Sequence, residues 1–321
     1  MPNILITGAA GFIGSNLVEH CLNAGFDVDA VDDLSNGHVE FLPRTFHVGN
    51  LFIKDFADES VLQRIRSGKY DVVVHLAAIP RVGYSVEHPI ETNDVNLSKT
   101  LRLIEACRGN IGLFIFASSS SVYGPTDNLP SLERHVKNPN SPYALQKSCA
   151  EEYLSLYNRL YGFSSVSLRF FNVYGPNCLG DSPYSTVVSA WLNAIKRGQP
   201  MRSDGDGSQS RDMCYVGDVA KAIVNLIAAP SGTFDAHRYN VASGSAVTNS
   251  QIMTWMKTTY PGAKHVDAPL RVGDVPRTLA SIDELQRVIV YNPTDFWTGL
   301  KITRNWFEDN WELIKSLRLN K

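Results

Sequence analysis

The chain has 321 residues, of which 44% are hydrophobic and 19% are charged, a composition typical of a packed globular protein. Its formal net charge of −2 provides no basic surface for nucleic acid or acidic membranes, and no apolar run approaches the ~18 residues of a spanning helix. The five cysteines are scattered without CxxC spacing, which disfavours a disulfide framework and a metal site. We therefore expect a cytoplasmic protein that binds neither membranes nor nucleic acids and holds no metal.

Short apolar runs alternate with helical patterns over the first half of the chain. Strands are predicted at residues 3–7, 27–31, 45–48, 72–76, 113–118 and 165–170, and several are apolar at nearly every position, as buried parallel strands are. Helical patterns at 13–23, 60–66, 93–107 and 143–161 lie between them. This alternation predicts an α/β fold in which a doubly wound parallel sheet is covered by helices on both faces.

After about Phe171 the alternation lapses and turn-forming sequences multiply, as in Asp204-Gly-Asp-Gly. A helix at 219–229 and a strand at 239–242 are expected to rejoin the sheet. We therefore predict two units. Residues 1–175 plus 212–243 form the sheet domain, and residues 176–211 plus 244–321 form a smaller lobe.

The first predicted strand leads directly into a glycine-rich turn, Gly8-Ala-Ala-Gly11-Phe-Ile-Gly14, and then into a helix. Gly8 would permit a tight turn, Gly11 would let the backbone approach a pyrophosphate, and Gly14 would allow close helix packing. The N-terminus of the helix offers N–H groups and a positive dipole end to phosphates. The pattern predicts a dinucleotide-binding loop, although a tight strand-to-helix turn without a ligand would need similar glycines.

The second predicted strand leads into Asp32-Asp33, and Asp32 lies 18 residues after Gly14, near the spacing of a ribose-binding carboxylate. A carboxylate accepts hydrogen bonds from both ribose hydroxyls and repels a 2′-phosphate. The sequence continues to Gly37 without an arginine or lysine. NAD is therefore predicted in preference to NADP. The alternative for Asp32 is a solvated turn aspartate, which is our interpretation of Asp33.

Tyr143 and Lys147 are four residues apart at the start of a helical pattern, so both project from one face. A tyrosine with a pKa of ~10 is a poor base at neutral pH. A fixed ammonium beside it, together with a positive nicotinamide ring, would favour the phenolate. The serine run at 118–121 ends a strand, where open α/β sheets bind ligands. An ordinary amphipathic helix and a serine-rich turn are the alternatives, and the joint occurrence of these elements favours a catalytic site.

These motifs together resemble the extended short-chain dehydrogenase/reductase family of NAD-dependent epimerases and dehydratases. The resemblance rests on the glycine-rich turn, His75-Leu-Ala-Ala78, Asn93, the serine run before Val122-Tyr-Gly124, and the Tyr143/Lys147 pair. It implies a Rossmann-type sheet with a smaller C-terminal substrate-binding lobe. It also implies that the catalytic residues are Ser119, Tyr143 and Lys147, where Ser119 is chosen because it stands four positions before Tyr123.

The resemblance also implies a set of binding residues. For NAD these are Gly8, Gly11, Phe12, Ile13, Gly14, Asp32, Asn36, Gly37, Asn50, Leu51, Leu76, Ala77, Ala78, Asn93, Tyr143, Lys147 and Phe170. For the sugar nucleotide they are Arg81, Ser119, Ser120, Tyr143, Asn172, Val187, Arg211, Arg271, Asp274 and Thr278. Asn50 and Pro80 depart from the family pattern, because an aspartate is usual at the first position and galactose-type epimerases often have a lysine at the second.

The residues beside Ser119 bear on the reaction. Family members that dehydrate nucleotide-linked glucose resemble Thr-Asp-Glu-Val-Tyr-Gly here, and decarboxylases of UDP-glucuronate carry a glutamate just before Val-Tyr-Gly. This chain has Ser119-Ser-Ser121 instead. Without these carboxylates the resemblance implies a UDP-hexose 4-epimerase, which removes hydride from C4, lets the 4-ketose turn over and returns the hydride to the other face. Because the net reaction consumes no NAD, tight retention of the cofactor is expected.

A sugar that turns over requires a firmly held nucleoside diphosphate. By resemblance, Arg211 and Arg271 clamp the diphosphate with Asn172, and Asp274 accepts the uridine ribose hydroxyls. Thr278 matches the family position that faces the 2-substituent of the sugar, where a tyrosine restricts the pocket to plain hexoses. UDP-GlcNAc and UDP-GalNAc are therefore the favoured substrates, and activity on UDP-Glc and UDP-Gal stays open.

Three alternatives stay open. The serine run also resembles UDP-glucuronate 4-epimerases, although Asn172 stands where these commonly have threonine. A 4-ketosugar-nucleotide reductase of the same fold would need an exchangeable cofactor. A non-catalytic NAD-sensing protein would tend to lose Tyr143 or Lys147, and both are present. The resemblance further implies a homodimer formed through the helices predicted at 93–107 and 143–161.

Overall fold

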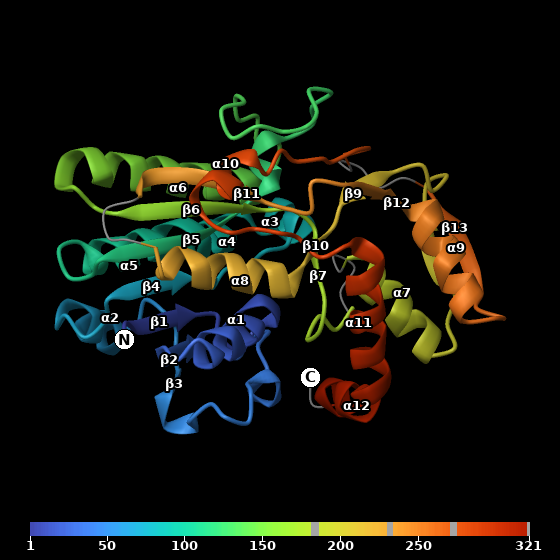
Figure 1. The fold of residues 1–321 in the computed structure, drawn as a ribbon, viewed down its shortest axis with the longest axis horizontal. Coiled ribbons are helices and arrows are strands. Elements are labelled where there is room, and N and C mark those ends of the chain that lie inside the picture. The colour runs from blue at the N-terminus through green and yellow to red at the C-terminus, as the bar shows by residue number, and fades with distance from the viewer. Residues whose placement is uncertain (181–185, 230–233, 270–274, 320–321) are drawn as a thin grey trace.

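The computed structural model describes residues 1–180, 186–229, 234–269 and 275–319 (Figure 1). Its centre is a seven-stranded sheet in the order β11-β6-β5-β4-β1-β2-β3, with every neighbouring pair parallel. The strands are β1 Asn3–Thr7, β2 Asp27–Asp32, β3 Leu51–Ile53, β4 Val72–His75, β5 Leu113–Ser119, β6 Ser165–Phe170 and β11 Asp235–Val241. The strand order reverses at β1, so the predicted doubly wound Rossmann-type sheet is confirmed.

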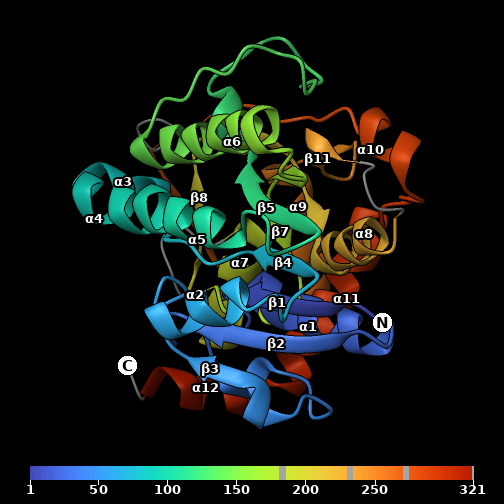
Figure 2. The same cartoon turned by 90° about the vertical axis from the view of Figure 1, so that its left-hand side faces the viewer.

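Successive residues of the buried strands supply two separate cores. Ile4 and Ile6 pack on one face beneath α1 and α8, whereas Leu5 packs on the other beneath α2, α5 and α6, and all three side chains are fully buried. The two helical layers lie on opposite sides of the sheet in Figure 2. The covering helices are α1 Phe12–Asn23, α8 Val216–Ile227, α2 Glu59–Arg66, α5 Thr100–Cys107 and α6 Pro142–Tyr161.

The longest of these helices, α6, has local signals at both ends. The Ser141 side chain accepts a hydrogen bond from the Ala144 N–H, and Pro142 occupies the first turn, where its missing N–H costs nothing. Gly162 ends the helix in the left-handed conformation at φ 64°. These ends fix where the first turn of α6, with Tyr143, meets the sheet.

The structure corrects two predicted elements. The prediction of a strand at residues 45–48 is wrong. Phe46 lies in a turn with its side chain buried, and residues Val48–Asn50 form a short 3-10 helix before β3. The single helix predicted at 93–107 is divided into a π-helical segment, Asp94–Lys99, and α5. Two short helices that the sequence pattern did not indicate, α3 Val82–Glu87 and α4 Pro89–Asn93, precede it.

A second lobe forms around a third core, to which Trp191, Met256 and Phe307 contribute. Its pairs of short strands are β8 Met201–Asp204 with β13 His265–Ala268, and β9 Ser210–Asp212 with β12 Ala246–Thr248. Its helices are α7 Val187–Lys196, α9 Asn249–Thr259, α11 Phe296–Asp309 and α12 Trp311–Leu319. A further strand pair, β7 Val173–Tyr174 with β10 Cys214–Tyr215, lies where the chain enters and leaves the lobe.

One segment of the predicted lobe packs on the sheet domain instead. In helix α10, Asp283–Val288, the Leu285 side chain belongs to the first core, together with Ile289 and Tyr291. The chain therefore returns to the sheet after β13 before it forms α11. Across the described residues, no helix is both long enough and apolar enough to cross a bilayer.

Candidate active site

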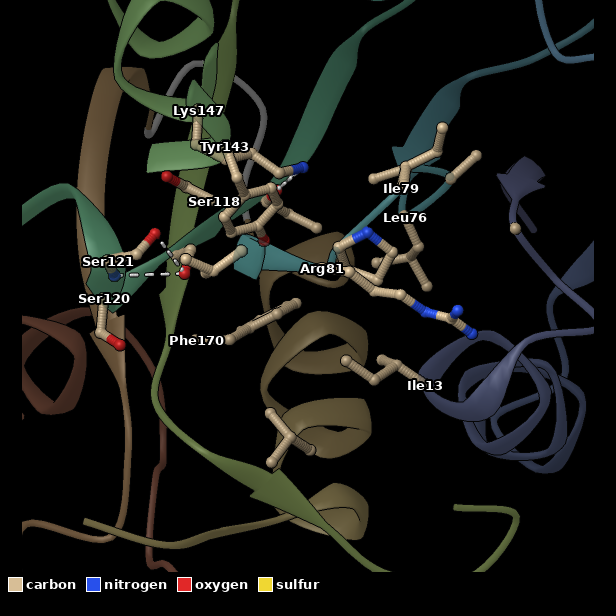
Figure 3. A pocket seen from close by; sticks show the side chains of 18 of the residues that line it. Ile13, Leu76, Ile79, Arg81, Ser118, Ser120, Ser121, Tyr143, Lys147 and Phe170 are labelled. Atoms are coloured by element: carbon tan, nitrogen blue, oxygen red, sulfur yellow. Dashed lines mark hydrogen bonds between the residues drawn. The ribbon is translucent and has the colours of Figure 1, made fainter. Parts of the chain in front are cut away.

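A cavity of about 860 Å³ lies at the carboxyl ends of β1, β2, β4, β5 and β6 and extends to the second lobe (Figure 3). Parallel α/β sheets bind ligands at this edge. Most of the predicted site residues line its wall. They are Gly8, Gly11, Phe12, Ile13, Gly14, Asp32, Asn36, Gly37, Leu76, Ala77, Ala78, Arg81, Ser119, Ser120, Tyr143, Lys147, Phe170, Asn172, Arg211 and Thr278.

Four predicted residues do not belong to this wall, and two lie outside the described residues. Asn50 donates from Nδ2 to the Val28 carbonyl at 3.3 Å, and Leu51 follows it in β3. Asn93 is exposed at the end of α4. Val187 begins α7 and packs against the core of the second lobe. The predictions for Arg271 and Asp274 fall on residues that the structure does not describe.

The residue that holds the loop after β4 is Asn96, one helical turn beyond Asn93. Its Oδ1 accepts from the Ile79 N–H at 2.8 Å, and its Nδ2 donates to the Ile79 carbonyl at 3.1 Å and to Gln146 Oε1 at 2.9 Å. Ile79 lines the cavity, so Asn96 fixes part of the wall from behind. Thr92, Asn96 and Thr100 are all buried although they are polar and recur every four residues, a sequence pattern that by itself favours a solvent-facing side of a helix, so no sequence signal indicated Asn96.

The glycine-rich turn forms a cradle in which side chains would collide with backbone. A Cβ on Gly8, at φ +70°, would lie 2.8 Å from the Ala77 nitrogen, and one on Gly14 would lie 2.0 Å from the Gly8 carbonyl oxygen. Gly11 is the N-cap of α1 and makes no side-chain cap, so the N–H groups of the first turn keep their capacity to bind an anion. These residues fit the pyrophosphate of a dinucleotide.

Asp32 is buried at the end of β2 beside this cradle. Its Oδ2 accepts from the Ala10 N–H and its Oδ1 from the Leu34 N–H, both at 2.9 Å. Burial raises the pKa of Asp32 above its ordinary value, and these backbone donors act in the opposite direction. A Cβ on Gly37 would come within 2.6 Å of Asp32 Oδ1. The carboxylate is thus fixed in the cavity wall, as a ribose-binding group requires.

Arg81 bridges two walls of the cavity. Its Nη2 donates to Asn36 Oδ1 at 3.1 Å, which joins the loop after β4 to the loop after β2. In Figure 3 the guanidinium extends away from Tyr143 toward Ile13, on the side of the cavity where α1 begins. Arg81 was predicted to bind the sugar nucleotide, and here its charge lies beside the predicted dinucleotide residues.

Tyr143 and Lys147 reach the cavity from the first turns of α6, next to the end of β5 (Figure 3). Lys147 Nζ donates to the Ala117 carbonyl at 2.8 Å and lies 5.9 Å from the centre of the Tyr143 ring. The Ser119 hydroxyl oxygen accepts from the Ser121 N–H at 3.2 Å. The structure therefore brings the three predicted catalytic residues to one wall.

Burial dominates the electrostatics of this trio. It raises the pKa of Tyr143 to about 12, while a hydrogen bond with Ser119 lowers it. Burial also lowers the pKa of Lys147 to about 7, and the charge of Glu151 raises it. The phenolate was expected to be favoured by the lysine and a nicotinamide ring together, and the protein groups alone favour the neutral phenol. A positively charged nicotinamide ring in the cavity would supply the missing stabilisation of the phenolate.

The second lobe closes the far end of the cavity through Thr278. Asn172 Nδ2 donates to Thr278 Oγ1 at 3.3 Å, and the Asp212 N–H donates to the same oxygen at 3.1 Å. The buried Asp212 carboxylate accepts from the backbone N–H groups of Ser243 and Ala280. Sequence reasoning missed Asp212, which joins the end of β9 to Ser243 after β11 and to Ala280 in the segment that follows Thr278.

Comparisons with known proteins agree with this geometry. The sequence model of the NAD dependent epimerase/dehydratase family matches residues 4–242. A putative UDP-glucose 4-epimerase of Methanocaldococcus jannaschii is 35% identical over 312 residues, which cover 96% of this chain and 99% of that protein.

Two solved structures have the same fold. The UDP-N-acetylglucosamine 4-epimerase of Methanobrevibacter ruminantium, in complex with UDP-N-acetylmuramic acid, is 34% identical at a TM-score of 0.90 and covers 96% of this chain and 99% of its own. The UDP-glucose 4-epimerase of Thermus thermophilus, in complex with NAD, is 33% identical at a TM-score of 0.85 and covers 95% of this chain and 99% of its own.

Proposed function

We propose that this chain, a member of the NAD-dependent epimerase/dehydratase family that uses NAD, is a UDP-hexose 4-epimerase. Its proposed reaction is the interconversion of UDP-GlcNAc and UDP-GalNAc. The observation that carries the proposal is that Ser119, Tyr143 and Lys147 share one cavity with the glycine cradle and Asp32. A dehydratase or decarboxylase would need a carboxylate beside Ser119. The described carboxylates of the cavity wall instead come from residues 32, 33, 55 and 91, outside the β5 segment.

The side chains support proton transfer at the sugar O4. The Tyr143 phenolate would take the O4 proton, Ser119 would hold the same oxygen through its hydroxyl, and Lys147 would keep a positive charge beside the phenolate. Bound NAD supplies the hydride acceptor and donor. After the 4-ketose turns over, the same phenol returns the proton to O4. One acid/base group therefore serves both directions, as an epimerase requires.

Thr278 supports the N-acetylated substrate. Its hydroxyl is engaged by Asn172 and by the Asp212 N–H, so this small side chain is held in the cavity wall. This leaves more room for a 2-acetamido group than an aromatic ring would. The neighbour from Methanobrevibacter ruminantium that carries this specificity in its name supports the same choice. UDP-Glc and UDP-Gal, which are smaller, would also fit.

The most informative experiment is NMR of the purified protein with UDP-GlcNAc and without added NAD. Appearance of the axial-C4 product would support the reaction, the substrate and a retained cofactor together. Turnover of UDP-glucuronate alone would point to the uronate epimerase, and product formation only with added stoichiometric NADH would point to a reductase. Retained NAD without turnover of any of these sugars would favour the non-catalytic sensor.

We further propose a homodimer in the cytoplasm. On α6, Leu145, Tyr153, Leu156 and Leu160 are exposed at helical spacing, so they form an apolar stripe. Helices α3 and α4 also contact α6, and Ile90 of α4 is 86% exposed. Leu156→Asp should convert a dimer into monomers in sedimentation experiments. None of the five cysteines, all described, forms a disulfide, which fits a reducing compartment.

A further inference from the structure

A buried charged cluster lies directly behind the catalytic residues. Its centre is Glu151 on α6, one helical turn after Lys147, with a side chain that has no solvent exposure. Glu151 Oε1 accepts from Ser118 Oγ at 2.6 Å and from Arg169 Nε at 2.9 Å, and Oε2 accepts from Arg169 Nη2 at 2.7 Å. Arg169 is itself only 1% exposed. A carboxylate removed from water in this way requires such partners, because an unpaired buried charge is strongly destabilising.

The cluster connects α6 to the two strands that carry the catalytic edge. Ser118 and Arg169 are direct neighbours in the register of β5 and β6, and both bind the same carboxylate. Ser118 stands between Ala117, whose carbonyl accepts from Lys147, and Ser119. On β5, Ala117 contacts Lys147 and Ser119 contacts Tyr143. The Ser118–Glu151 bond therefore holds β5 against α6 at the residue between these two contacts.

A second branch of the cluster reaches the substrate side. Arg169 Nη1 donates to the Tyr123 hydroxyl at 2.9 Å, and this hydroxyl donates to Asn240 Oδ1 at 2.6 Å. Asn240 Nδ2 in turn donates to the carbonyls of Ser131 and Ser281. The network thus runs without interruption from the catalytic helix to the segment that follows Thr278.

We propose that Glu151 is a positioning residue, which acts through Ser118 to set the register of β5 on α6 and hence the placement of Ser119 and Lys147 beside the Tyr143 hydroxyl. The inference rests on the proposed function. Glu151 does not line the cavity, so it acts through its neighbours and not on the sugar.

The charge of Glu151 has a separate consequence for Lys147. His75, from β4, faces the lysine but stays neutral, because burial and the lysine charge hold its pKa well below the ordinary value. Tyr143 is the other titratable neighbour on α6. Glu151 is therefore the anion that opposes the effect of burial on the pKa of Lys147. Around Glu151 itself stand three cations, Arg169 on β6, Arg238 on β11 and Lys137 in the loop before α6.

The decisive variant is Ser118→Ala, because it removes the bond to β5 and leaves the Glu151–Arg169 ion pair in place. We expect kcat for the UDP-sugar to fall roughly tenfold, since small misplacements of catalytic groups are costly. KM and the bound NAD content should stay close to wild type, and the melting temperature should fall by a few degrees, because one partner of a buried carboxylate is lost while the Arg169 pair remains. Glu152→Gln is the matched control, because this neighbour also pairs with Lys137 and Arg238 yet is 60% exposed, and it should keep wild-type kcat.

Glu151→Gln tests the charge. Its amide oxygen can still accept from Ser118, but loss of the anion should move the alkaline limb of the kcat–pH profile down by roughly one pH unit. Glu151→Asp keeps the anion on a side chain one methylene shorter, so the alkaline limb should stay at its wild-type position while kcat falls as in Ser118→Ala. If Glu151→Gln fails to fold with Arg169 unpaired, Ser118→Ala decides alone. An active wild type with an unchanged Ser118→Ala variant overturns this inference only, whereas a wild type that turns over no UDP-sugar overturns the proposed function and the inference with it.

Discussion

Lys147 and Tyr143 lie one helical turn apart on α6, with the lysine ammonium nitrogen 5.9 Å from the centre of the tyrosine ring. Both side chains are buried, and burial shifts both toward their neutral forms. The buried ammonium is therefore electrostatically costly to the folded protein, and the phenolate needs a positively charged nicotinamide ring beside the pair.

This cost predicts how stability depends on pH. Lys147 has a folded pKa of about 7 against an ordinary value of 10.5, so between these values the unfolded chain binds more protons and stability rises with pH. Lys147→Met removes the group that is costly below pH 7. In NAD-free protein, the melting temperature of the variant relative to wild type should therefore be higher at pH 6 than at pH 10. A difference that is constant across this range would contradict the assigned burial of the charge.

The glycine cradle predicts two different phenotypes for two similar substitutions. In Gly14→Ala the added Cβ would lie 2.0 Å from the Gly8 carbonyl oxygen, so the turn must distort and the melting temperature should fall by several degrees. In Gly11→Ala the nearest described atom is 3.2 Å away, so the fold should persist. The added methyl group would instead stand where the pyrophosphate approaches. Calorimetry combined with the NAD content of the purified variants distinguishes these outcomes, and equal loss of stability in both would be evidence against the assignment.

The pocket residue Thr278 predicts a change in substrate preference. Thr278→Tyr should lower kcat/KM for UDP-GlcNAc by at least about tenfold, because the ring would occupy the space of the acetamido group, and should spare UDP-Glc. Thr278→Ser is the matched control, since it retains the hydroxyl that binds Asn172 and the Asp212 N–H. Coupled assays with both sugars measure the ratio. A parallel loss for both sugars in Thr278→Tyr would refute the specificity assignment.

Much of the sheet domain follows from local sequence. The bounds of β1 and β6 were predicted correctly, because buried parallel strands are apolar runs bounded by turns. Gly8 and Gly14 could be located because the backbone geometry there excludes other residues. The failure at residues 45–48 has the opposite cause. Phe46 is buried from a turn, and a short apolar run does not distinguish this case from a strand.

The rest depends on contacts distant in sequence. In the second lobe β8 pairs with β13, and the first paired residues are Met201 and His265. Neither segment alone has a strong strand pattern. Glu151 is an acidic residue on a helix, which a sequence pattern assigns to solvent unless its partners Ser118 and Arg169 are known. Asn93 was named by resemblance, and the burial of its neighbour Asn96 could not be predicted for a similar reason, since it arises from packing against the loop that contains Ile79.

The central claim is that the Tyr143 hydroxyl is the acid/base of a UDP-hexose 4-epimerase, and Tyr143→Phe tests it most directly. The variant keeps the ring and removes one oxygen, and Tyr153→Phe on the exposed side of α6 is its control. Initial rates of UDP-GlcNAc epimerisation should be followed by NMR at equal NAD content. We predict a fall of roughly 10³-fold for Tyr143→Phe and none for Tyr153→Phe. A Tyr143→Phe rate within twofold of wild type would contradict the account.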